Sequence, residues 1–197
     1  MRKRVSYCYE LHPVLAAFSA QWSTLSASPI PLLAPVKSLS CLAPALMLYR
    51  DSPSAKLSDQ ADSQTRQILG PLLPVLYWDS LSAVPDGVHW QKCELDDDAV
   101  VSTLIGEWLR WIILGADPVF AELCRQVFAH ILDTRQCQQQ FGVPRLSQHA
   151  WAQRVGLSRG QLAHAAATLK QQQLASAAIV TADKDPALNF FKARYGR

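Results

Sequence analysis

The spacing of apolar residues around Gly156 is the feature that most restricts how this chain can fold. Ala152 lies four residues before the glycine, Val155 and Leu157 flank it, and Leu162 follows six residues later. Two helices that cross steeply through a short turn need a small residue where they touch and a glycine that tolerates positive φ. We therefore expect two helices within residues 146–170. Further apolar residues of the expected buried face are Trp151, Ala165 and Leu169.

The same stretch resembles a known DNA-binding motif. Leu146-Ser-Gln148, Ala152, the run from Val155 to Arg159 and Leu162 are similar to the helix-turn-helix of bacterial transcription regulators, particularly the Crp-type winged form. The resemblance is limited to about residues 146–175. It implies binding of double-stranded DNA, with the second helix in the major groove.

The resemblance does not extend to the first 140 residues. A Crp-like cyclic-nucleotide barrel needs many glycine turns, and this part of the chain has no glycine before Gly70. We therefore expect no nucleotide-binding function and no cofactor.

Candidate DNA contacts follow from the predicted helices. Ser147 and Ser158 can cap the two helices, Arg159 can pair with guanine, and Gln161 can pair with adenine. Gly160, Ala163 and Ala167 offer base edges little beyond contact with a thymine methyl, so weak specificity or a protein-binding role is the alternative. His164 is also expected to face the major groove from the second helix. The remaining candidate contacts, chiefly to phosphates, are Gln148, Arg154, Lys170, Lys184, Lys192 and Arg194.

Charge is distributed unevenly along the chain. Residues 1–140 contain 11 Lys and Arg against 14 Asp and Glu, whereas residues 141–197 contain 8 against only Asp183 and Asp185. A basic module attached to a slightly acidic body is typical of proteins that bind nucleic acid. We therefore expect residues 1–140 to form a dimerisation, effector or scaffold domain, and residues 145–197 to form the DNA-binding module.

The remaining elements are expected from local patterns. Residues 5–10 favour a strand, and helices are expected at 13–25, 59–69, 99–114 and from Pro118 to about residue 139. Beyond Leu174 we expect a strand over 175–181, a wing turn at 182–185, and a short helix after Pro186 in preference to a second wing strand. The expected fold class is mainly α, with an α+β arrangement as the alternative for the N-terminal part.

Several function classes find no support in the sequence. The five cysteines form no C-x-x-C pair and no zinc-ligand spacing, so we expect no metal. Phosphate-binding loops, a G-x-S-x-G motif and paired catalytic carboxylates do not occur, so we do not expect an enzyme. Proline and charged residues interrupt the apolar runs, which argues against membrane binding and for a cytoplasmic protein.

These observations lead to one main expectation and one alternative. The main one is a transcription regulator that binds double-stranded DNA in a sequence-dependent manner, as a homodimer or as a subunit of a larger complex. The alternative is a non-enzymatic scaffold subunit of a larger bacterial assembly, which uses the same module for contact with protein or nucleic acid.

Overall fold

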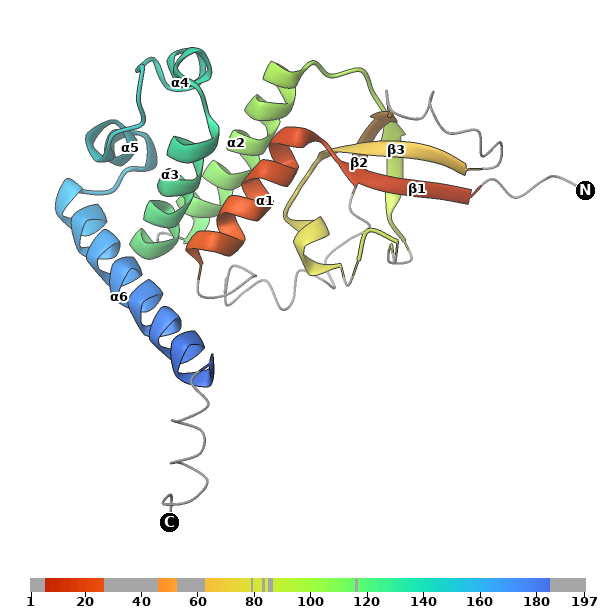
Figure 1. Cartoon of the computed structure of the whole chain (residues 1–197). Coiled ribbons are helices and arrows are strands. Elements are labelled where there is room, and N and C mark those ends of the chain that lie inside the picture. The colour runs from red at the N-terminus through yellow and green to blue at the C-terminus, as the bar shows by residue number, and fades with distance from the viewer. Residues whose placement is uncertain are drawn as a thin grey trace, which may run out of the picture.

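The computed structural model describes residues 6–26, 46–52 and 63–184, apart from residues 79, 83, 85, 86 and 116. A small sheet lies at one end and a group of helices at the other (Figure 1). The fold is therefore mixed α+β. The expectation of a largely helical chain is consistent with this, and the sheet lies in the N-terminal part, for which an α+β arrangement was the alternative. In chain order the elements are β1 Ser6–Leu11, α1 Pro13–Leu25, β2 Leu46–Asp51, β3 Ser63–Gly70, the 3₁₀ helix η3 Pro74–Tyr77, β4 His89–Lys92, α2 Asp97–Gly115, α3 Pro118–Ile131, α4 Thr134–Phe141, α5 Gln148–Val155 and α6 Arg159–Lys184.

The four strands form one sheet in the order β1-β3-β2-β4. β3 pairs parallel with β1 and antiparallel with β2, and β2 pairs parallel with β4. The strand expected at residues 5–10 is confirmed as β1. The helix expected at residues 59–69 is wrong, because residues 63–70 form the strand β3. This strand is hydrogen-bonded along both edges, and such pairing overrides weak local propensity.

Aromatic side chains form the centre of the helical part. Phe18 and Trp22 of α1 contact Trp108 of α2, with ring centroids 4.7 and 5.0 Å away. Phe120 and Phe128 of α3 close the same cluster, at 5.7 Å from Trp108 and 5.2 Å from Phe18 respectively. The expected helices at 13–25 and 99–114 are confirmed as α1 and α2. Their aromatic faces hold α1, α2 and α3 together.

The single helix expected from Pro118 to about residue 139 is wrong, because the chain breaks at Leu132 and restarts as α4. Asp133 caps the new helix: its carboxylate accepts from the N–H of Gln136 at 2.7 Å, and the Gln136 side chain accepts from the N–H of Asp133 at 3.1 Å. This reciprocal capping box satisfies two backbone donors at the start of α4. Leu132 is buried at the break, so the bend is packed against the core.

The strand expected over 175–181 and the wing turn expected at 182–185 are also wrong. α6 continues without interruption from Arg159 to Lys184. Alanine is the strongest helix former, and this stretch contains Ala175, Ala177 and Ala178. The short helix expected after Pro186 lies outside the described residues. Among the helices that the structure describes, none is long and apolar enough to cross a membrane.

Candidate nucleic-acid interface

Gly156 forms the turn between α5 and α6. Its φ of 71° and ψ of 22° place it in the left-handed region, where it ends α5, and its N–H donates to the Ala152 carbonyl. Leu157 donates to the same carbonyl at 3.1 Å. A residue with a Cβ is strained in this conformation. The glycine on which the sequence prediction was centred therefore has the role expected of it.

The apolar face of the α5–α6 pair is buried as predicted. Trp151 and Leu162 are both 0% exposed. Leu157, expected in the same core, is half-buried. The Trp151 indole also donates to the Ala121 carbonyl of α3 at 2.9 Å. The other buried side chains of the pair are Ala152, Val155, Ala165 and Leu169.

A buried ion pair connects α3 to the start of α5. Glu122 is 0% exposed, and Arg125 donates to its two carboxylate oxygens at 2.6 and 2.8 Å. Arg125 also donates to the Leu146 carbonyl at 3.1 Å, just before α5 begins. Further donors to Glu122 are the side-chain amides of Gln126 at 3.1 Å and Gln148 at 3.4 Å. The bidentate pair lies within α3 and fixes the orientation of both side chains. The bonds to Leu146 and Gln148 then link α3 to the start of α5 by polar contacts as well as apolar ones.

The caps at the two helix starts involve three predicted DNA-contact residues. The Ser147 hydroxyl accepts from the N–H of Ala150 at 3.2 Å, as expected of the cap of α5. The Ser158 hydroxyl accepts from the N–H of Gln161 at 3.2 Å, and the Gln161 side-chain oxygen accepts from the N–H of Ser158 at 2.8 Å. Ser158 and Gln161 therefore form a capping box. The side-chain oxygen expected to read adenine is engaged in this box.

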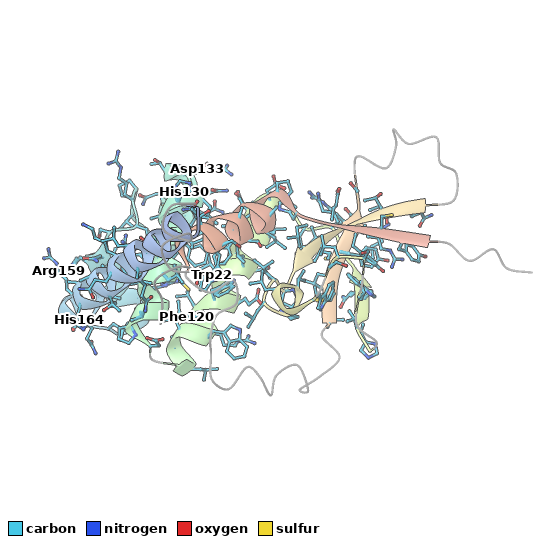
Figure 2. The ribbon with its side chains drawn as sticks, turned by 60° about the horizontal axis from the view of Figure 1, so that its bottom comes forward. Trp22, Phe120, His130, Asp133, Arg159 and His164 are labelled. Carbon is cyan, nitrogen blue, oxygen red and sulfur yellow. The ribbon has the colours of Figure 1, made fainter. Side chains whose placement is uncertain are left out.

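Exposed basic side chains remain on the outer surface of the pair. Arg154, Arg159, His164 and Lys170 are all exposed. Figure 2 shows Arg159 and His164 near the end of α6 that lies farthest from the sheet. The sequence contains no Asp or Glu from Thr134 to Ala182. The positive charges on this surface therefore have no acidic neighbours along their own segment.

The structure describes the side chains of eight of the eleven residues predicted to contact DNA. Gln148 is turned toward Glu122 of α3. The side chain of Lys184 is not described, and Lys192 and Arg194 lie outside the described residues. The prediction omitted two exposed basic residues, His149 within α5 and Arg145 just before it. Their position in the acid-free stretch was the available signal.

Two titratable groups with shifted pKa values, Glu107 and His12, lie away from the α5–α6 pair. Burial raises the pKa of Glu107 in α2 to about 7, against the opposing effect of the backbone N–H groups of Leu72 and Leu73. Burial likewise lowers the pKa of His12, and a hydrogen bond to Asp97 opposes this shift. Among the described residues, no cluster of three His, Cys, Asp or Glu side chains is arranged to hold a metal ion.

Comparison with known proteins finds no matching family model, no similar curated protein and no similar solved structure.

Proposed function

We propose that this chain binds double-stranded DNA through the α5–α6 pair, used as a helix-turn-helix, and acts as a transcription regulator. The observation that carries the proposal is the combination of a two-helix unit packed on α3 with exposed Arg154, Arg159 and Lys170 and no Asp or Glu between residues 134 and 182. A helix enters the major groove best when a second helix supports it and crosses the backbone. Contacts of Trp151 and Gln148 with α3 provide that support.

Salt dependence of binding tests this proposal directly. Neutralising phosphates releases counterions, so affinity for a duplex falls with salt at a log–log slope of about −0.9 per phosphate. We expect Arg154→Ala and Lys170→Ala each to weaken binding to all duplexes about equally and to reduce the slope by about 1. Fluorescence anisotropy with labelled duplexes over a salt series measures both quantities.

Arg135→Ala is the matched control. Arg135 is also exposed, but it lies on α4, where it donates to both carboxylate oxygens of Asp98 at 2.8 Å. We expect its loss to leave duplex affinity and the salt slope unchanged. Absence of binding at low salt, or equal effects of all three substitutions, contradicts a DNA-binding role for the α5–α6 surface.

A scaffold role is the second candidate. It is favoured by exposed apolar side chains outside the basic surface: Ile113 and Leu114 at the end of α2, and Leu174 on α6, are each more than 60% exposed. Exposed apolar groups are common at protein contacts when they form a patch. In that case a protein partner would associate in a salt-insensitive way, and substitution of Arg154 or Lys170 would not change nucleic-acid affinity.

A further inference from the structure

The first turn of α6 carries the polar side chains best placed to reach base edges, because the N-terminal end of a recognition helix points into the major groove. Three such side chains belong to Ser158, Arg159 and Gln161, and all three are exposed. Gly160 and Ala163, which are also exposed, have no side-chain hydrogen-bonding group. Which bases this turn can recognise therefore depends on how these three polar side chains are used within the protein.

Two of the three are used to cap the helix. The Ser158 hydroxyl accepts from the Gln161 N–H, and the Gln161 side-chain oxygen accepts from the Ser158 N–H. Bidentate recognition of adenine by glutamine needs that oxygen as acceptor for the adenine N6 amino group and the amide N–H as donor to N7. Reading adenine with Gln161 would thus require its oxygen to serve the Ser158 N–H and the adenine amino group together, or the capping box to open.

Arg159 is in a different situation. It is the first residue of α6, it is exposed, and among the described residues no side chain or carbonyl pairs with its guanidinium. Its nearest acidic residues in sequence are Asp133 and Asp183. A guanidinium presents a planar fork of donors that matches the O6 and N7 acceptors of guanine.

We propose that base recognition by α6 is carried by Arg159 and directed at guanine, while Gln161 is a positioning residue that holds the first turn of the helix and reads no base. This inference rests on the proposed DNA-binding function and names the base on which that function depends. The position at which the sequence alone expects adenine recognition is thereby reassigned to helix capping.

Removal of single ring nitrogens from DNA tests the inference. A duplex is first enriched from a random-sequence library with the full-length protein, and is then prepared with natural bases, with 7-deazaguanine, or with 7-deazaadenine. Each deaza base lacks the N7 acceptor but still forms Watson–Crick pairs. We expect 7-deazaguanine to weaken binding about fivefold or more, which is the lower end for one bidentate contact, and 7-deazaadenine to have no effect.

Three variants assign the effect to residues. Arg159→Ala should bind the natural and 7-deazaguanine duplexes equally, so that the ratio of their affinities falls to about one. Gln161→Ala should lower the thermal stability of the protein through loss of the cap and keep the wild-type affinity ratio. Arg154→Ala, the control from α5, should weaken binding to both duplexes and keep the ratio as well.

The outcomes separate this inference from the proposed function. Salt-dependent binding with no enriched sequence, no response to 7-deazaguanine, or a response to 7-deazaadenine that Gln161→Ala removes each overturns the guanine inference and leaves DNA binding intact. Absence of binding to any duplex overturns both.

Discussion

Glu107 is a half-buried carboxylate whose hydrogen bonds come from backbone donors. Its two oxygens accept from the N–H groups of Leu72 and Leu73 at 2.8 and 2.7 Å, which ties α2 to the segment after β3. Desolvation outweighs these bonds and the attraction of Arg110, so the pKa rises from 4.5 to about 7. The residue therefore makes the fold sensitive to pH in the neutral range.

The direction of that sensitivity follows from linkage. A carboxyl group with a raised pKa in the folded state favours folding while it is protonated, so its contribution is present below pH 4.5 and is lost as the pH rises through 7. The shift from 4.5 to about 7 corresponds to roughly 3 kcal/mol. We expect Glu107→Gln to remove this loss, so that the free energy of unfolding of the variant changes less than that of the wild type between pH 5 and pH 8.

Chemical denaturation at several pH values measures the effect. Glu94→Gln, which removes an exposed carboxylate, is the control and should follow the wild type. Parallel curves for the wild type and Glu107→Gln would show that the carboxylate does not titrate in this range.

At the scale of elements, the α5–α6 pair was the part best predicted from sequence. Its core and its turn depend on residues within about 25 positions of one another, so the spacing around Gly156 was sufficient to identify them. The Ser158–Gln161 capping box was also visible as a Ser-x-x-Gln pattern, but Gln161 was interpreted as a base reader. In the structure the Gln161 side-chain oxygen belongs to that box, and its expected contact with adenine stays a prediction.

Elements that depend on distant partners were predicted less well. β3 was mistaken for a helix because its pairing with β1 and β2 cannot be read from its own residues. The strand expected over residues 175–181 was wrong although its own residues favour a helix. A run containing Ala175, Ala177 and Ala178 has strong helix propensity, and the family resemblance was given more weight than that propensity.

The turn at Gly156 gives a prediction at this scale. A Cβ built on Gly156 meets no atom within 4 Å, so the cost of Gly156→Ala comes from its φ of 71° alone. Left-handed backbone costs a residue with a side chain about 1–2 kcal/mol, and we expect a loss of unfolding free energy of about that size, measured by thermal denaturation.

Gly106→Ala is the matched control for this change. Gly106 lies inside α2 with open space around it, and alanine in a helix interior is about 0.5–1 kcal/mol more favourable than glycine. The two substitutions add the same methyl group and should have opposite signs. If both stabilise the protein, the positive φ at Gly156 is incorrect.

Across the whole molecule, one continuous hydrophobic core joins the expected domains 1–140 and 145–197. Trp151 of α5 contacts Phe128 of α3 and Phe141 of α4, with ring centroids 6.0 and 5.9 Å apart. Farther along α6, Gln173 donates to the Leu25 carbonyl at the end of α1 at 3.0 Å. The surface proposed to bind DNA therefore depends for its shape on α1, α3 and α4, which all begin before residue 140.

This dependence predicts that the C-terminal part does not fold by itself. A fragment of residues 142–197 keeps the α5–α6 turn but loses α3, and with it the Ala121 acceptor of Trp151 and the Glu122–Arg125 pair. Burial of a large apolar side chain contributes about 1.5–3 kcal/mol, and a two-helix unit without its partner has too small a core to stand alone. We expect far-UV circular dichroism of the fragment to show little helix and no cooperative thermal transition, whereas residues 1–197 should unfold in one transition. A fragment that folds cooperatively and binds duplex DNA as tightly as the full chain would establish it as an independent domain, and α1 to α3 would then contribute nothing to the DNA-binding surface.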